Sequence, residues 1–142
     1  MYKNLSIILF SGALWLGLFK VKGLIDDSQV HETVPTIGLG PVLQLIRTGT
    51  IEIIDMRPPQ DYNLSHIKDA FSVHQLASAD MGECLLSRLS KARNIVLYSG
   101  GGVTPEMRQF AQALSKRGIE GVAFYSGGFR EWLAAGLPVE TQ

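Results

Sequence analysis

The feature that most constrains the fold is an alternation of short apolar runs with segments of helical periodicity. Four runs are expected to form strands: Ile51–Asp55, Phe71–Val73, Ile95–Tyr98 and Val122–Tyr125. Strands that alternate with helices predict a mostly parallel central sheet covered by helices on both faces, which is a three-layer α/β domain. In such sheets, ligands bind outside the carboxyl ends of the strands, where a loop leads into a helix.

The expected helices lie between these strands, where apolar side chains recur at helical spacing. They cover Pro41–Arg47, Glu83–Leu89, a longer segment that follows Thr104, and Phe129–Ala135. Thr104 is the predicted N-cap of the longer helix, because a proline occupies the first helical position after it. Ser126 is the predicted N-cap of the last helix, and Phe129 and Trp132 are expected to pack in the core.

The N-terminus carries an uncharged apolar run over residues 5–19, flanked by Lys3, Lys20 and Lys22. Apolar residues fall on all sides of a helix here, so the segment is not an amphipathic surface helix. We expect an uncleaved hydrophobic membrane helix. The run is nearer in length to a signal-peptide core than to a span of about 20 residues, so a cleaved signal and a buried core helix remain alternatives.

This interpretation divides the chain into three parts: an anchor or signal segment over 1–22, a linker over 23–35, and one α/β domain over 36–142. The expected location is membrane-anchored, or secreted or periplasmic if the segment is cleaved. Lysines flank the run on both sides, so the positive-inside rule does not assign the side of the membrane.

Composition argues against nucleic-acid binding, disulfide bonds and a metal site. Lys and Arg number 13, as do Asp and Glu, so the formal net charge is zero and nucleic-acid binding is disfavoured. The single cysteine, Cys84, cannot form an intramolecular disulfide, and its apolar neighbours Leu85 and Leu86 predict a buried structural thiol. The three histidines have no metal-ligand spacing, and we expect neither a metal nor a cofactor.

Three blocks of the domain, in the same order and spacing, resemble the rhodanese family. They are Ile54–Tyr62 continued by Ser65–Ala70, Ile95–Gly102, and Gly127–Val139. The first resembles the family's Asp-x-Arg strand end and Gly-His-Ile-x-Gly-Ala turn, the second its active-site loop, and the third its C-terminal helix. The resemblance covers residues 36–142 and implies the rhodanese-like three-layer fold.

The candidate active-site loop departs from the family's pattern. Active members carry a cysteine directly after the residue that corresponds to Tyr98, in a loop of the form Cys-Arg-x-Gly-x-Arg. Ser99 takes the cysteine position, Gly100 the first arginine position and Thr104 the last, while Gly102 keeps the pattern.

The family's chemistry needs a thiolate that accepts a sulfur atom and carries it as a persulfide, which an oxygen nucleophile cannot do. We therefore expect a catalytically inactive, membrane-tethered module that binds a protein partner or a small anion. The candidate anion-binding loop comprises Ser99, Gly100, Gly101, Gly102, Val103 and Thr104. The alternative for this loop is an inherited tight turn with no ligand.

Two other functions stay open. One is a thiosulfate or persulfide sulfurtransferase that uses another residue, or whose Ser99 is an introduced substitution. The other is a hydrolase that uses Ser99, although the sequence offers no evident activating base. The resemblance gives Asp55, Arg57 and His66 structural roles: the first two are expected to connect loops at a strand end, and the His66 ring to bond nearby backbone.

Overall fold

The computed structural model describes residues 34–77 and 79–142. The predicted hydrophobic segment 1–22 and most of the predicted linker lie outside these residues, so both stay predictions. Within the described part of the chain, no helix is both long and apolar enough to cross a membrane.

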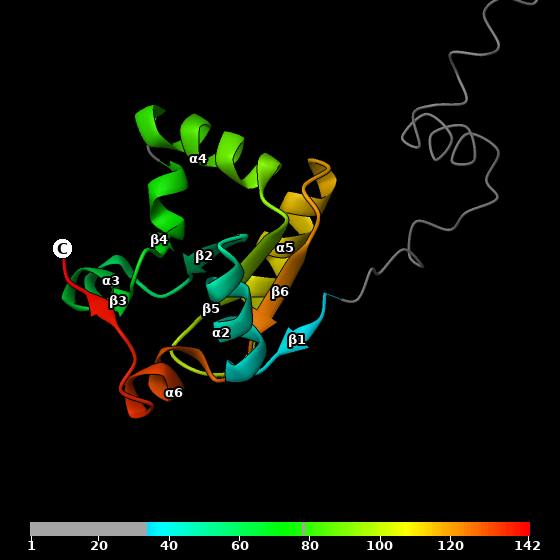
Figure 1. Cartoon of the computed structure of the whole chain (residues 1–142). Coiled ribbons are helices and arrows are strands. Elements are labelled where there is room, and N and C mark those ends of the chain that lie inside the picture. Colours follow the sequence, from blue (N-terminus) through cyan, green and yellow to red (C-terminus); the bar gives the residue numbers. More distant parts are fainter. Residues whose placement is uncertain (1–33, 78) are drawn as a thin grey trace, which may run out of the picture. The chain divides into compact units, whose positions relative to one another are not determined.

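A five-stranded parallel sheet forms the centre of the domain (Figure 1). Its strand order is β1-β6-β5-β2-β4, and every neighbouring pair is parallel. The strands are β1 (Thr36–Ile37), β2 (Ile51–Asp55), β4 (Phe71–Ser72), β5 (Asn94–Tyr98) and β6 (Val122–Tyr125). The four predicted strands are therefore confirmed within one residue at each end.

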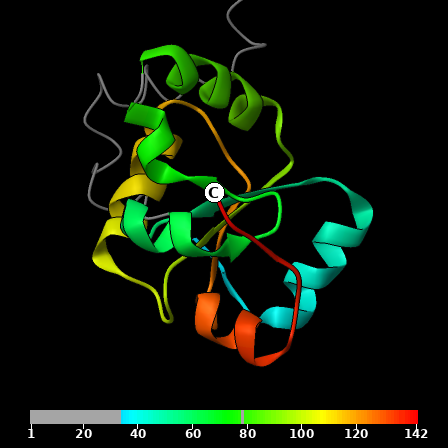
Figure 2. The ribbon, with the colours of Figure 1, turned by 90° about the vertical axis from the view of Figure 1, so that its left-hand side faces the viewer.

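Helices cover both faces of this sheet, and Figure 2 shows the strands between α5 and α2. They are α2 (Leu39–Thr48), α3 (Pro59–Leu64), α4 (Ala79–Lys91), α5 (Pro105–Lys116) and α6 (Gly128–Ala134), with a 3₁₀ turn, η2, at Val73–Ala77. The expected three-layer, mostly parallel α/β fold is confirmed.

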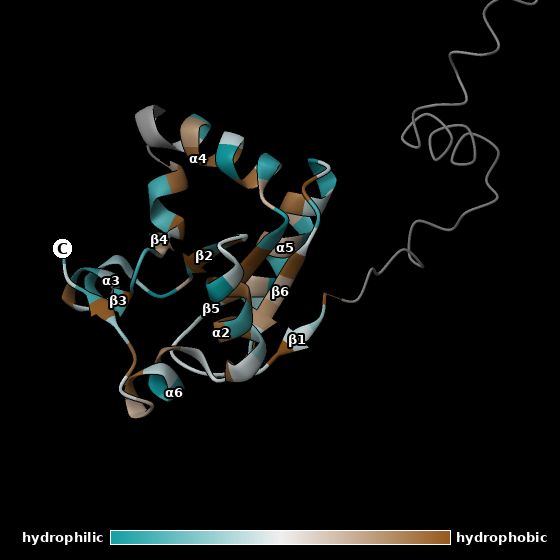
Figure 3. Ribbon diagram, viewed as in Figure 1, coloured by the Kyte–Doolittle hydropathy of each residue, from teal (hydrophilic) through white to brown (hydrophobic). Residues whose placement is uncertain are grey.

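Two hydrophobic cores follow from the period-two alternation of side chains along each strand. Ile54, Leu97 and Phe124 point to the face that α4 and α5 cover, where they meet Leu89 and Met107. The intervening strand residues point to the face that α2 and α6 cover: Ile53, Val96, Tyr98, Ala123 and Tyr125. The central strands are accordingly mostly apolar in Figure 3, as expected for a sheet buried on both faces.

The N-cap of α5 is the predicted one. The Thr104 hydroxyl accepts a hydrogen bond from the backbone N–H of Met107 at 3.3 Å, and Pro105 occupies the first helical position. The predicted cap of α6 is wrong, because Gly127 is the N-cap residue. The Ser126 hydroxyl instead donates to the carbonyl of Ile37, which attaches the turn to β1.

A second, two-stranded antiparallel sheet lies beside the main one. It pairs β3 (His66–Ile67) with β7 (Val139–Glu140), so that His66 lies opposite Glu140. These strands, together with β1 and α3, were not predicted, because segments of two to six residues are too short to show a period.

Candidate functional site

The loop 99–104 begins at the carboxyl end of β5 and leads into α5, where the parallel sheet predicts a site. Ser99 is only 6% exposed. Its hydroxyl donates to the carbonyl oxygen of Gly102 at 2.9 Å and accepts from the backbone N–H of Gly101 at 3.2 Å. Both contacts lie within the loop, so the hydroxyl stabilises the turn that it belongs to.

The start of α6 holds the same loop from the other side. The N–H of Phe129 donates to the Ser99 carbonyl at 2.8 Å, and the N–H of Arg130 donates to the Gly100 carbonyl at 3.1 Å. In the opposite direction, the N–H of Gly102 donates to the carbonyl of Ser126 at 2.8 Å. The loop and the turn before α6 are therefore one hydrogen-bonded unit.

Two charged side chains border the loop. The Arg130 guanidinium lies against Gly101, where an added Cβ would be 2.8 Å from a guanidinium nitrogen. Glu106 lies in the first turn of α5, and hydrogen bonds from its own backbone N–H and from the Thr104 hydroxyl lower the pKa of its carboxyl. Within residues 34–77 and 79–142, the Ser99 hydroxyl forms hydrogen bonds with backbone groups and with no histidine, lysine or carboxylate that could serve as its base.

A buried ion pair lies at the strand end next to this loop. Asp55 is fully buried at the end of β2, and it accepts hydrogen bonds from the Arg57 backbone and guanidinium and from the Tyr98 hydroxyl, the last at 2.6 Å. Burial raises the pKa of Tyr98, and the charge of Asp55 raises it further. Burial would lower the pKa of Arg57, but the hydrogen bonds and charge of Asp55 outweigh it and raise that pKa.

Arg57 also connects elements, as the sequence led us to expect. Its guanidinium donates to the Ser65 carbonyl at 2.7 Å and lies 3.8 Å from the centre of the Phe129 ring on α6. Tyr98 in turn accepts from the backbone N–H of Ile67 at 3.2 Å. The Asp55–Arg57 pair and Tyr98 thus connect β2, β5, β3 and α6. Tyr98 is also the residue that precedes the loop 99–104.

His66 is buried in β3, and its Nδ1 lies 2.9 Å from the carbonyl oxygen of Tyr62. The predicted bond between the ring and nearby backbone is therefore present. The ring stacks on the Tyr62 ring, with centroids 3.8 Å apart. Its Nε2 faces the Glu140 carboxylate at 3.9 Å.

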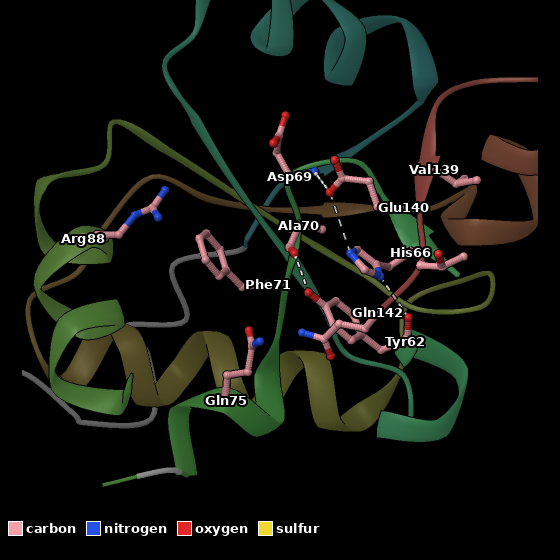
Figure 4. Close-up of a pocket in the computed structure, with 11 residues that line it drawn as sticks. Tyr62, His66, Asp69, Ala70, Phe71, Gln75, Arg88, Val139, Glu140 and Gln142 are labelled. Atoms are coloured by element: carbon pink, nitrogen blue, oxygen red, sulfur yellow. Dashed lines mark hydrogen bonds and ion pairs between the residues drawn. The ribbon is translucent and has the colours of Figure 1, made fainter. Parts of the chain in front are cut away.

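A pocket of about 750 Å³ lies beside His66 (Figure 4), and none of its lining residues belongs to the loop 99–104. Its walls come from α3, the segment from β3 to η2, α4 and the C-terminal segment: Tyr62, His66, Asp69, Ala70, Phe71, Gln75, Arg88, Val139, Glu140, Thr141 and Gln142. Sequence reasoning missed it, because it depends on the pairing of β3 with β7 across more than 70 residues. The i, i+4 spacing of Tyr62 and His66 was the one local signal.

The prediction for Cys84 is wrong, because this thiol is exposed on α4. Leu85 and Leu89 of the same helix are buried instead, so the neighbouring positions carry the core contacts. In Figure 1, the C-terminal end of α4 leads into the amino end of β5, whereas the loop 99–104 follows the carboxyl end of that strand beside α6. No cluster of metal-ligating side chains occurs within residues 34–77 and 79–142.

Comparison with known proteins gives one consistent result. The profile of the rhodanese-like domain matches residues 40–135. A thiosulfate sulfurtransferase, GlpE, from Actinobacillus pleuropneumoniae is 30% identical over 112 residues, which are 79% of this chain and 98% of that protein.

Two solved structures agree in fold. The rhodanese-like domain of the Anabaena Alr3790 protein is 27% identical with a TM-score of 0.58, covering 76% of this chain and 80% of that one. A thiosulfate sulfurtransferase from Pseudomonas aeruginosa is also 27% identical with a TM-score of 0.55, and the match covers 76% of this chain but 19% of that longer protein.

Proposed function

The chain belongs to the rhodanese-like domain family, and we propose that it is a member without sulfurtransferase activity that acts as a membrane-tethered binding module. Ser99 is the observation that carries the proposal. It occupies the position at which the family's pattern has the nucleophilic cysteine. Its hydroxyl is held between two groups of its own loop.

The chemistry of sulfur transfer explains why this residue decides the matter. A thiolate attacks the outer sulfur of thiosulfate, the sulfur–sulfur bond of the donor breaks, sulfite leaves, and the enzyme keeps the sulfur as a persulfide. Nucleophilicity depends on the thiolate, which the N–H groups of a loop at a helix N-terminus favour. A serine hydroxyl has a much higher pKa and forms no persulfide, so Ser99 cannot perform this step.

Cys84 is the only thiol of the chain, and an active sulfurtransferase would have to use it. It is exposed on α4, the helix that precedes β5, and does not belong to the loop 99–104 that follows this strand. A nucleophile at Cys84 would lie outside the loop whose N–H groups favour a thiolate. The name of the GlpE relatives therefore supports sulfur transfer for the family and not for this chain.

A hydrolase that uses Ser99 fits the geometry poorly. A serine nucleophile needs a base that removes its proton and an open approach for the substrate. Ser99 is buried and donates its proton to a backbone carbonyl. A fluorophosphonate probe that labelled Ser99 in the native chain would revive this alternative.

The loop is also our candidate for weak binding of a small anion such as sulfate. The Arg130 guanidinium beside Gly101 favours an anion. Two features argue against strong anion binding. The N–H groups of Gly101 and Gly102 already donate within the protein, and the Glu106 carboxylate borders the loop. Sulfate titration followed by amide NMR tests this part, and loop amides that do not shift would remove it.

The thiosulfate-to-cyanide assay on the full-length chain in non-ionic detergent tests the proposal. We expect no thiocyanate above background from the native chain or from Cys84→Ala. Ser99→Cys on the Cys84→Ala background should exceed that background by about tenfold or more, because the loop still offers the Gly101 N–H to a thiolate. Native turnover that disappears with Cys84→Ala would overturn the proposal.

Membrane tethering rests on the uncharged run over residues 5–19. We expect the full-length chain to remain in the membrane pellet after alkaline carbonate extraction, since an apolar span resists extraction while surface-bound proteins are released. Recovery of the intact chain in the supernatant would contradict tethering and leave the account of Ser99 untouched.

A further inference from the structure

The pocket beside β3 and β7 is separate from the loop 99–104, and none of its lining residues belongs to that loop. One of its most buried side chains is that of His66, which is 6% exposed. Because Nδ1 lies at hydrogen-bond distance from the Tyr62 carbonyl, the proton of the neutral ring is on Nδ1. Nε2 then presents a lone pair to the pocket.

The group that faces this nitrogen is also an acceptor. Glu140 Oε2 lies 3.9 Å from Nε2, which is too long for a hydrogen bond between them. The same carboxylate accepts from the backbone N–H of Asp69 at 3.1 Å, which fixes its position. Two acceptors at this separation can both be reached by one nitrogen donor at ordinary distances of about 2.9 Å.

Charge at this end of the pocket has one sign. Glu140 and Asp69 line it together with His66, and Figure 4 places the three near one another. The one arginine of the lining, Arg88, lies at the other side of the pocket in Figure 4. Its guanidinium is bonded to both carboxylate oxygens of Glu52, at 3.0 and 3.1 Å, so most of its charge is balanced.

Apolar surface continues from this acidic end toward Arg88. Ala70 and Phe71 line the pocket between His66 and Arg88 in Figure 4, and the Arg88 guanidinium lies 4.4 Å from the centre of the Phe71 ring. A long basic side chain has the matching form, with a methylene stem that packs on apolar groups and a charged end that seeks hydrogen-bond acceptors. A small inorganic cation would use the carboxylate and leave the apolar wall uncovered.

We propose that this pocket binds a lysine or arginine side chain of a partner polypeptide, whose charged end bridges His66 Nε2 and the Glu140 carboxylate. The stem lies against Ala70 and Phe71. This inference goes beyond the account of the loop 99–104, and it holds whether or not that loop transfers sulfur.

The test uses capped tripeptides of the form acetyl-Gly-X-Gly-amide, in which X is lysine, arginine or norleucine, an uncharged residue with the same four-carbon stem as lysine. Amide NMR of the full-length chain in detergent follows their binding. We expect saturable shifts of the Asp69 and Glu140 amides with the lysine and arginine peptides and none with norleucine. Unchanged amides, or equal shifts with all three peptides, would overturn the proposal.

Glu140→Gln is the informative variant, because glutamine keeps an acceptor for the Asp69 N–H while it removes the charge. It should weaken binding of the basic peptides about tenfold, the scale of one charge-assisted hydrogen bond. Asp61→Asn, an exposed acid of α3 that does not line the pocket, is the matched control and should bind like the native chain. Equal weakening in both variants would show general attraction to acidic surface and overturn the site.

Discussion

Asp55 and Arg57 show how much a single pair of residues determines in this domain. Asp55 has no exposure to water, and Arg57 has 9%. A buried carboxylate is tolerated because every contact it makes is with a donor: the Arg57 guanidinium, the Arg57 backbone and the Tyr98 hydroxyl. The pair is therefore a structural requirement at the base of the loop.

Removing one charge of the Asp55–Arg57 pair should strongly destabilise the domain. Asp55→Asn leaves the Arg57 guanidinium buried without its counter-charge, and we expect a loss of about 3–5 kcal/mol in the free energy of unfolding. Urea denaturation measures it. Glu52→Gln is the control, since it breaks the Arg88–Glu52 pair, whose arginine is 51% exposed, and should change stability by less than about 1 kcal/mol. Equal losses in the two variants would contradict this interpretation.

Three of the four tyrosines should lose their hydroxyl proton at a higher pH than tyrosine in an unfolded chain. Burial raises the pKa of Tyr62, Tyr98 and Tyr125, and the hydrogen bond to Glu131 raises that of Tyr125 further. Because folding raises these pKa values, the stability that depends on neutral tyrosines is complete below about pH 10, the pKa of tyrosine in the unfolded chain. It decreases as the pH rises above that value. Tyrosinate absorbance should therefore develop at higher pH in the native chain than in denaturant. Superimposable titration curves would contradict the burial of these rings.

At the scale of elements, the loop 99–104 and α6 depend on each other. Gly128 begins α6 with φ +61°, and an added Cβ would lie 2.6 Å from the Ser99 carbonyl oxygen and 2.8 Å from the Gly101 backbone. Only glycine permits both the backbone conformation and this close approach. The shape of the candidate site thus depends on a residue of α6, which lies well beyond the end of the loop in the sequence.

Gly128→Ala should destabilise the domain by at least about 2 kcal/mol and alter the amide shifts of Ser99 and Gly101, because it combines a strained φ with a backbone clash. Gly136→Ala is the matched control. Gly136 has nearly the same φ, +64°, but no atom lies within 4 Å of an added Cβ, so only the strain of about 1 kcal/mol applies. Thermal denaturation and amide spectra separate the two effects, and equal losses would contradict the clash.

The sequence predicted the long elements well and the short ones poorly. Ile51–Asp55 and Val122–Tyr125 have the predicted bounds, because continuous apolar runs suit strands buried on both faces. Thr104 and Pro105 likewise marked the start of α5 through local chemistry. Ser126 was wrongly predicted to be the N-cap of α6. Its hydroxyl donates to a carbonyl of β1, and no local pattern encodes a hydrogen bond to a residue 89 positions away.

At the scale of the whole molecule, the two candidate sites illustrate the same limit. The loop 99–104 was predicted because strand, glycine-rich turn and helix are consecutive in the chain. The pocket with His66 and Glu140 was not, because the two residues meet only through the pairing of β3 with β7. Cys84 was misplaced for a related reason: its apolar neighbours suggested burial, yet the packing of α4 turns Leu85 and Leu89 inward and leaves Cys84 exposed.

The central claim is that this rhodanese-like domain cannot hold a sulfur atom as a persulfide, and intact-mass spectrometry tests it most directly. The full-length chain is incubated with thiosulfate, desalted without reductant and weighed, beside Cys84→Ala and the double variant Ser99→Cys, Cys84→Ala. We expect no added sulfur on the native chain or on Cys84→Ala, and one added sulfur atom on the double variant. A native chain that gains one sulfur atom, releases it to cyanide and loses this ability with Cys84→Ala would contradict the account.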